Sequence, residues 1–152
     1  MGPEDLPLIA SWLALPHVRE WWGDPSEQLS LVSGDLDEPA MEQYIVETGA
    51  RPVGYLQCYR LTDWNTGFGV HPVGTRGIDL FVGDPELIGR GYGSALIRQF
   101  ADGLLSGGAP RVVTDPDPEN ARAIRAYEKA GFRKDKLVDT PDGPALLMVR
   151  TE

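Results

Sequence analysis

A glycine-rich turn stands in front of the most regular helical pattern of the chain. It reads Gly89-Arg-Gly-Tyr-Gly-Ser94 and follows an apolar run that ends at Val82. Glycines let a backbone approach a ligand closely, and a helix N-terminus offers unpaired N–H groups and a partial positive charge. Arg90 adds a full positive charge. The turn is predicted to bind a pyrophosphate group, with simple capping of a packed helix as the alternative.

Two common phosphate-binding patterns do not fit this turn. A nucleotide P-loop needs Gly-Lys followed by Ser or Thr, and the turn contains no lysine. A dinucleotide fingerprint could begin at Gly91 and Gly93, but its third glycine position is Leu96, where close packing of helix on strand requires glycine. Nucleoside triphosphate and dinucleotide binding are therefore disfavoured.

Three aspartates and one tyrosine are candidates for acid–base chemistry. Asp79 lies inside an apolar strand pattern, where a carboxylate is costly to bury unless it is paired or used. Asp115 ends the next strand, and Asp142 stands in a Pro-Asp-Gly turn, a sequence that turns favour for local reasons. Tyr127 lies on an apolar helical stripe, and its pattern alone favours core packing.

Hydrophobic periodicity and turn residues predict the elements that must position these groups. The helices are predicted over Pro3–Trp22 with a break at Pro16, from Gly91 to about Gly107, and from a cap at Asp117 to Gly131. Residues 23–39 are predicted to be a polar loop with at most one helical turn. The strands are predicted over Glu42–Glu47, Val53–Leu61, Arg76–Val82, Arg111–Asp115, Phe132–Val138 and Ala145–Val149. This order predicts one α/β domain over residues 1–152, with a mixed sheet.

Composition limits the partners and the compartment. The 152 residues carry 14 Lys and Arg against 23 Asp and Glu, a net charge of −9, which disfavours nucleic acids and anionic membranes and favours cationic ligands. The chain has an acidic N-terminus and no apolar run near the roughly 20 residues of a membrane span, so a cytoplasmic location is predicted. Cys58 is expected to be a buried hydrophobe rather than a nucleophile, and His17 and His71 are expected on the surface without a metal.

Several segments resemble one enzyme family. Arg90-Gly-Tyr-Gly-Ser94 resembles the acyl-coenzyme A signature of the GNAT acetyltransferase superfamily, with Ser94 where Gly or Ala is usual. Thr114–Phe132 resembles its second conserved segment. Four further segments resemble the aminoglycoside 6′-N-acetyltransferases more specifically: Glu20-Trp-Trp-Gly23, Gly54–Tyr59, Arg76-Gly-Ile-Asp79 and Thr140–Ala145.

The resemblance implies a fold and a reaction. The implied fold is a mostly antiparallel sheet flanked by helices; its usual first strand has no counterpart before Pro3, so either the sheet lacks that strand or the native chain starts upstream. The implied reaction is direct acetyl transfer from acetyl-CoA to a primary amine of a cationic small molecule, foremost the 6′-amine of an aminoglycoside, by a monomer or homodimer. Acylation of a siderophore lysine-type amine and non-catalytic acyl-CoA binding are the alternatives.

The resemblance also implies roles for individual residues. Tyr127 would protonate the departing thiolate of coenzyme A. Asp79 would bind the acceptor amine, and it would either accept its proton, directly or through water, or serve for binding alone. Asp63 and Trp64 belong to a variable acceptor loop and rank lower. The implied cofactor-binding residues are Phe81, Val82, Arg90, Gly91, Tyr92, Gly93, Ser94 and Asn120, and the implied substrate-binding residues are Trp22, Gln57, Tyr59, Asp79, Asp115 and Asp142.

Overall fold

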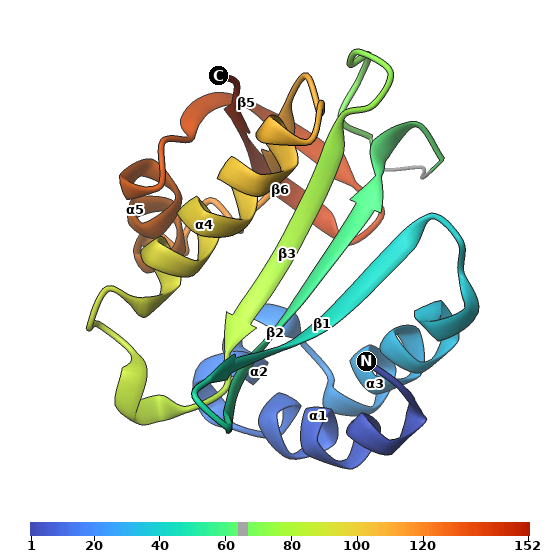
Figure 1. Cartoon of the computed structure of the whole chain (residues 1–152), viewed down its shortest axis with the longest axis vertical. Coiled ribbons are helices and arrows are strands. Elements are labelled where there is room, and N and C mark those ends of the chain that lie inside the picture. The colour runs from blue at the N-terminus through green and yellow to red at the C-terminus, as the bar shows by residue number, and fades with distance from the viewer. Residues whose placement is uncertain (64–66) are drawn as a thin grey trace.

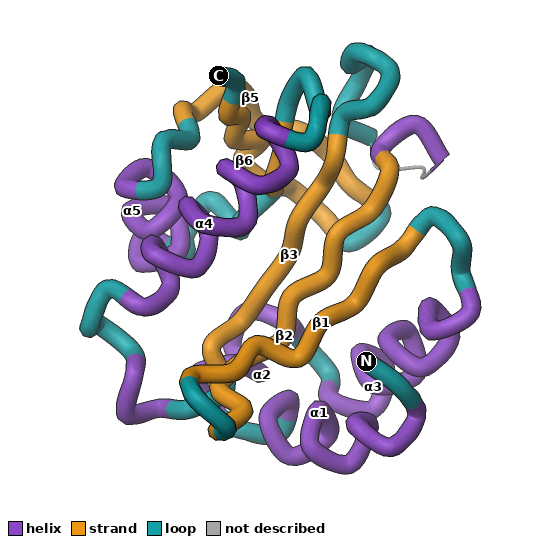
Figure 2. Tube along the Cα trace, in the orientation of Figure 1, coloured by secondary structure: helices purple, strands orange, loops and turns teal. Residues whose placement is uncertain are grey.

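The computed structural model describes residues 1–63 and 67–152, so Trp64 of the predicted acceptor loop lies outside the described residues. One six-stranded sheet runs through the molecule in the order β1-β2-β3-β4-β6-β5 (Figures 1 and 2). Only β3 and β4 pair in parallel; every other neighbouring pair is antiparallel. The strands are β1 (Met41–Thr48), β2 (Arg51–Arg60), β3 (Arg76–Val82), β4 (Val112–Thr114), β5 (Arg133–Thr140) and β6 (Gly143–Arg150).

Helices cover both faces of the sheet because the strands alternate their apolar side chains between the faces. On β2, Leu56 packs into the core formed with α4 (Tyr92–Ser106) and α5 (Ala121–Lys129). Its neighbour Tyr55 packs instead into the core formed with α1 (Leu6–Leu13), α2 (Pro16–Trp22) and α3 (Pro25–Gly34). The predicted mixed sheet flanked by helices is confirmed, and the predicted break of the first helix at Pro16 separates α1 from α2.

The prediction of a loop over residues 23–39 was wrong, because α3 occupies ten residues of it. Asp24 caps this helix by accepting a hydrogen bond from the Glu27 N–H at 3.0 Å, and Pro25 takes the first helical position. Val32 is its only buried residue, so the helix has little apolar periodicity to reveal it. The Asp-Pro pair was the local signal that sequence reasoning passed over.

The predicted cap of α5 at Asp117 was also wrong. Asn120 caps the helix, accepting from the Ala123 N–H at 3.2 Å. Asp117 closes the preceding turn instead, since its main-chain carbonyl accepts from the Asn120 N–H at 2.9 Å. The helix ends as predicted, with Gly131 at φ +96°.

The sheet opens between β3 and β4. The two strands pair only through Arg76 with Val112 and Gly77 with Val113. The Thr114 hydroxyl then donates to the Ile78 carbonyl at 3.0 Å, after which β4 has ended while β3 continues to Val82. The last residues of β3 therefore have a strand on one side only, within the described chain.

The strand β1 forms one edge of the sheet. Within residues 1–63 and 67–152, no strand precedes α1. The helices of the same residues include none that is both long and apolar enough to cross a membrane.

Candidate active site

A cleft of about 710 Å³ lies where β3 and β4 separate, and its described lining residues include no Lys or Arg. It brings together six residues predicted to bind the substrate with two predicted to serve the cofactor or the chemistry. Those eight are Trp22, Gln57, Tyr59, Asp79, Asp115, Asp142, Asn120 and Tyr127. The eight acids of the lining are Glu20, Asp24, Glu27, Asp35, Asp79, Asp115, Asp117 and Asp142.

Sequence reasoning placed Trp22 in the site but missed the acids of the wall that α2 and α3 supply. These acids are Glu20, Asp24, Glu27 and Asp35. Asp24, Glu27 and Asp35 were missed because residues 23–39 were predicted to be a loop, whereas Glu20 lies in a predicted helix and was not singled out. Burial, with the charge of Glu38 in addition, raises the pKa of Asp35. The wall adds four acids to the cleft, which suits a ligand with more than one positive charge.

Asp79 and Asp115 form a carboxyl pair at the centre of the cleft. Asp79 lies on β3 and Asp115 directly follows β4, at the point where the two strands begin to separate, and each carboxyl alters the pKa of the other. Two buried carboxyls that interact cannot both ionise at low cost, so one of them favours its protonated form. Burial raises the pKa of both groups, and for Asp115 the negative charge of Asp79 raises it further. A cationic ligand would offset the energetic cost of burying a negative charge in this pair.

Two residues of β2 complete the wall next to this pair. Gln57 Nε2 donates to Asp79 Oδ2 at 3.0 Å. Tyr59 is 4% exposed and its ring lies against Gly77, where any side chain would collide with it. Trp22 packs edge-on against Tyr55, with ring centroids 6.1 Å apart. Trp22 and Tyr59 thus line the cleft and pack into the core at once.

Tyr127 approaches the cleft from α5, on the other side of the opening in the sheet. It is 6% exposed and packs edge-on against Phe132, with ring centroids 5.4 Å apart. Burial raises the pKa of its phenol, and the nearby Asp79 and Asp115 raise it further, although the Thr114 hydroxyl acts in the opposite direction. The phenol therefore keeps its proton at neutral pH and is available as a general acid.

The predicted pyrophosphate turn forms the start of α4. Gly91 caps the helix with φ +81°, a conformation that favours glycine, and Ala95 is the first residue to bond back to it, at 3.1 Å. The N–H groups of Tyr92, Gly93 and Ser94 therefore have no acceptor within the helix. The Ser94 hydroxyl donates to the Gly91 carbonyl at 3.1 Å, so serine at the last position of the motif stabilises the turn.

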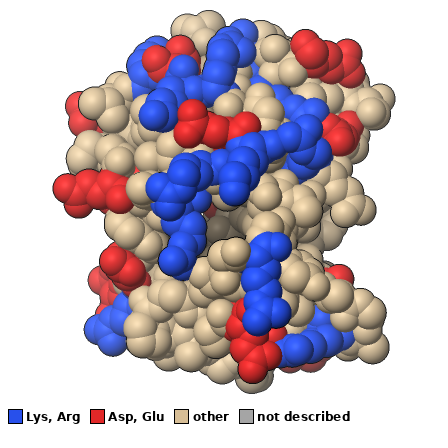
Figure 3. Space-filling view, turned by 90° about the vertical axis from the view of Figure 1, so that its left-hand side faces the viewer, with Lys and Arg blue, Asp and Glu red and all other residues tan. Residues whose placement is uncertain are grey.

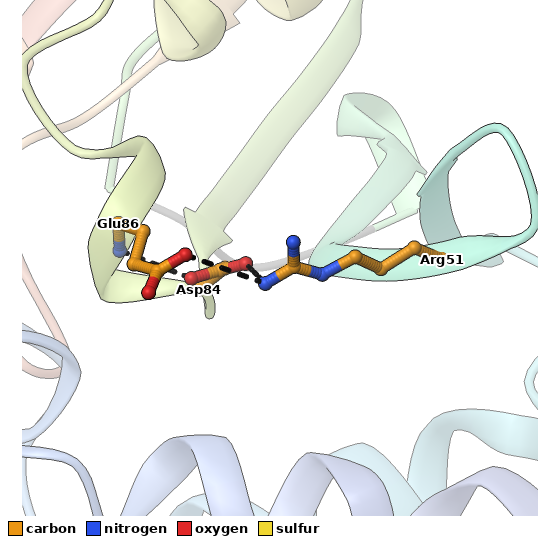
Figure 4. A network of polar contacts seen from close by, with 3 residues as sticks. All are labelled: Arg51, Asp84 and Glu86. Carbon is orange, nitrogen blue, oxygen red and sulfur yellow. Dashed lines mark hydrogen bonds and ion pairs between the residues drawn. The ribbon is translucent and has the colours of Figure 1, made fainter.

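A polar network fixes the loop that leads into this turn (Figure 4). Asp84 is 8% exposed, pairs with Arg51 of β2 and accepts from the Glu86 N–H at 3.0 Å. Arg51 also lies 3.9 Å from the Glu86 carboxylate, and the Asp84 N–H donates to the Val53 carbonyl at 3.3 Å. The loop from β3 to α4 is thus tied to β2 at its start.

The main-chain groups of the last β3 residues point alternately toward β2 and toward the opening. The Gly83 N–H donates to the Val53 carbonyl at 2.8 Å, so the odd-numbered residues direct their main-chain groups toward β2. Val82 directs its own toward the opening, whereas Phe81 faces β2 and buries its ring against Trp12 and Trp22. Of these two predicted cofactor residues, only Val82 directs its main-chain N–H toward the opening, and its carbonyl is hydrogen-bonded to His17.

Both histidines are half-buried and hydrogen-bonded. His17 Nε2 is hydrogen-bonded to the Val82 carbonyl at 2.9 Å, which joins α2 to the end of β3. His71 bonds the Phe68 carbonyl at 3.0 Å and Arg111 at 3.1 Å. Their partners lie far along the chain or on an irregular loop, so spacing could not reveal them. Cys58 is buried as predicted, and burial raises its pKa to about 11. The described residues contain no group of three or more His, Cys, Asp or Glu that could hold a metal ion.

Positive charge gathers outside the acidic cleft. Lys and Arg side chains crowd the side of the molecule formed by α4, α5 and the loop before α4, around a hollow (Figure 3). Exposed basic residues of these elements are Arg90, Arg98, Arg122, Arg125 and Lys129. An anionic ligand at the α4 turn and a cationic ligand in the cleft would thus each meet the opposite charge, which explains how an acidic chain can bind both.

Comparisons with known proteins point in one direction. The sequence model of the acetyltransferase (GNAT) domain matches residues 2–140. An aminoglycoside N(6′)-acetyltransferase type 1 of Klebsiella pneumoniae is 35% identical over 99% of this chain and 80% of its own length. A kanamycin resistance protein of Rhizobium radiobacter is 46% identical over 51% of this chain and 73% of its own.

Solved structures agree with the sequence relatives. A crystal structure of the aminoglycoside acetyltransferase AAC(6′)-Ib with coenzyme A and kanamycin has a TM-score of 0.89 and 36% identity, over 100% of this chain and 92% of that one. A structure of AAC(6′)-Ib with acetyl-CoA has a TM-score of 0.90 and 34% identity, over 100% of this chain and 90% of that one.

Proposed function

Because the chain belongs to the GNAT acetyltransferase family, we propose that it transfers the acetyl group of acetyl-CoA to the 6′-amine of an aminoglycoside antibiotic. The observation that carries the proposal is an acidic cleft, free of Lys and Arg among its described lining residues, that meets a protonated tyrosine where the sheet opens. Relatives and solved structures with aminoglycoside acetyltransferase names support this acceptor over a siderophore amine. They equally support an enzyme over a non-catalytic acyl-CoA-binding domain.

Acetyl-CoA fits the residues on the basic side of the opening. The N–H groups of Tyr92, Gly93 and Ser94 would hold its pyrophosphate, and Arg90 would add charge. Val82 has main-chain groups on the opening side of β3, where a donor can polarise the thioester carbonyl. When bound, acetyl-CoA supplies the activated acyl group. Asn120 lines the cleft, and its side-chain oxygen is already engaged in capping α5, so only its amide nitrogen is available.

The chemistry needs one proton removed and one supplied. Asp79 would bind the acceptor amine and accept its proton as the nitrogen–carbon bond forms. Tyr127 would donate its proton to the sulfur as the carbon–sulfur bond breaks, which avoids the release of a free thiolate. Asp142 and the acids of the α2–α3 wall would bind the other ammonium groups of the acceptor by charge, and Asp115 would accept a hydrogen bond from one of them. Trp22, Gln57 and Tyr59 would line the sugar rings.

A thiol-release assay with acetyl-CoA and kanamycin tests this function. We expect saturable release that depends on kanamycin and falls on the order of a hundredfold in Asp79→Asn. Asp37→Asn is the matched control, because it removes one exposed carboxylate of the same type outside the cleft. Release no faster than in the absence of an acceptor would contradict the proposal. Faster turnover of a lysine-type amine with a longer acyl-CoA would favour the siderophore alternative instead.

Three further properties stay predictions. We propose that residues 1–152 work as one domain, since all six strands belong to one sheet. A cytoplasmic location is proposed because acetyl-CoA is available there. The protein is proposed to act as a monomer or homodimer, without nucleic acid, membrane or metal.

A further inference from the structure

A row of polar side chains crosses three strands and ends at Asp79. In the strand register, Gln43 of β1 lies opposite Gln57 of β2, and Gln57 lies opposite Asp79 of β3. Tyr55 lies on the same face of β2, two residues before Gln57. Gln43 Nε2 donates to the Tyr55 hydroxyl at 3.1 Å, and Tyr55 donates to Gln57 Oε1 at 2.8 Å. Gln57 Nε2 completes the row by donating to Asp79 Oδ2 at 3.0 Å.

The far end of the row determines the direction of every bond in it. Gln43 Nε2 also donates to the main-chain carbonyl of Val32, on α3, at 2.9 Å. A carbonyl oxygen can only accept, so this end of the Gln43 side chain must be its NH₂ group. The second hydrogen of that group goes to the Tyr55 oxygen, and the Tyr55 hydroxyl must then donate onward to Gln57. The Gln57 amide is left with its NH₂ group toward Asp79.

We propose that this row makes Asp79 the ionised member of the Asp79–Asp115 pair and that Gln43 and Tyr55 are positioning residues for it. An NH₂ group donates to a carboxylate but offers nothing to a carboxylic acid proton, so it favours the anion at Asp79. The proton that the pair shares then belongs to Asp115, which donates it to Asp79. The inference rests on the proposed acetyl transfer, in which the Asp79 carboxylate takes a proton from the acceptor amine.

Other groups around Asp79 act in both directions. Burial raises the pKa of Asp79 and the charge of Asp142, from the β5–β6 turn, adds to it, whereas the interactions with Gln57 and with Asp115 lower it. Tyr59 of β2 and Tyr127 of α5 stay neutral near pH 7 because burial raises their pKa values. Burial likewise keeps Cys58 neutral, and the charge of Asp35 acts on the Tyr55 end of the row by raising the pKa of that phenol. Gln57 is a neutral donor that bonds to Asp79, and no hydrogen bond joins it to Asp115 among the described residues, so it favours ionisation of Asp79 over that of Asp115.

Tyr55→Phe tests the row without touching the cleft acids. It removes the donor to Gln57 Oε1, so the Gln57 amide is free to turn its oxygen toward Asp79 and raise the pKa of that carboxyl. Since the base must be ionised, we expect the acidic limb of the pH profile of kcat for kanamycin acetylation to move to higher pH by about one unit. At pH values below the limb, kcat should therefore fall about tenfold. The KM for acetyl-CoA stays unchanged, which a general loss of structure would not allow.

Tyr44→Phe is the matched control. Tyr44 lies on β1 beside Gln43, and its hydroxyl donates to Glu42 at 2.6 Å, outside the row. The limb should stay at its wild-type pH in this variant. Gln43→Met gives a second, independent variant, because it cuts the row at its far end and should move the limb in the same direction as Tyr55→Phe.

Carbon-13 NMR of the aspartate carboxyls in the protein without substrates separates this inference from the proposed function. Signals assigned with Asp79→Asn and Asp115→Asn should show Asp79 ionised and Asp115 protonated near neutral pH, with the pKa of Asp79 raised in Tyr55→Phe and Gln43→Met. This result would support the row even if no aminoglycoside were acetylated. A protonated Asp79 in the wild type, or carboxyl titrations unchanged in both variants, would overturn it.

Discussion

At the scale of single residues, this site depends on groups whose protons are held by burial. Tyr127 is almost fully buried, so its phenol stays protonated far above neutral pH. Asp79 and Asp115 share a proton at the opening of the sheet for a related reason, since neither can be fully solvated there. One side of the opening is thus prepared to give a proton and the other to accept one.

Replacing Tyr127 by Phe should remove the proton donor and leave the packing against Phe132 intact. We expect kcat to fall on the order of a hundredfold, with little change in the KM for acetyl-CoA. Steady-state thiol release measures both constants, and Tyr44→Phe controls for the loss of a tyrosine hydroxyl elsewhere. A wild-type kcat in Tyr127→Phe would exclude the phenol as the acid.

Replacing Asp115 by Asn should increase the stability of the protein and lower its activity. The folded-state pKa of Asp115 lies above the unfolded value, so between the two the unfolded chain binds fewer protons and stability falls as pH rises. Removal of this group abolishes that decline. Urea unfolding should show the variant more stable than wild type by on the order of 2 kcal/mol at pH 8 and by less at pH 5. Equal differences at the two pH values would argue against a raised pKa.

At the scale of elements, the start of α4 depends on one backbone conformation. Gly91 has φ +81°, which costs an L-residue about 1–2 kcal/mol, and there is no atom near its missing side chain to clash with. An effect of substitution would therefore come from the shape of the turn and not from a collision.

Gly91→Ala should raise the KM for acetyl-CoA several-fold, because the turn must relax out of the conformation that directs its N–H groups outward. Gly103→Ala is the control, since Gly103 lies exposed inside the same helix with open space around it. Isothermal titration with coenzyme A measures the effect without turnover. Equal affinities in the two variants would mean that the turn does not hold the cofactor.

At the scale of the whole molecule, charge is divided between two regions. The cleft has eight acids and no described Lys or Arg, while basic side chains gather over α4 and α5. The net charge of −9 conceals this division. Each substrate can thus approach through a region of opposite charge while the total charge remains negative.

This division predicts how salt affects binding. Raising the ionic strength from about 0.01 M to about 0.3 M shortens the screening length, so the KM values for kanamycin and for acetyl-CoA should both rise. The kanamycin value should rise the more, because its binding region contains the larger number of charges. Steady-state assays at fixed pH with added NaCl measure both. A kanamycin KM insensitive to salt would contradict electrostatic binding in the cleft.

The sequence by itself determined the strands, most helices and the glycine turn, and it pointed to three of the acids that line the cleft, because caps, periodicity and turn residues act over a few neighbouring positions. It did not reveal α3, whose apolar periodicity is weak, or the cap at Asn120, which competed with an equally good Asp117 nearby. Only the tertiary structure decided that Asp79 meets Asp115, that Gln43 is linked to Asp79 through two side chains of β2, and that His17 bonds Val82. Those contacts depend on strand register and on where β3 leaves β4, and register is set by pairing between residues far apart in the chain.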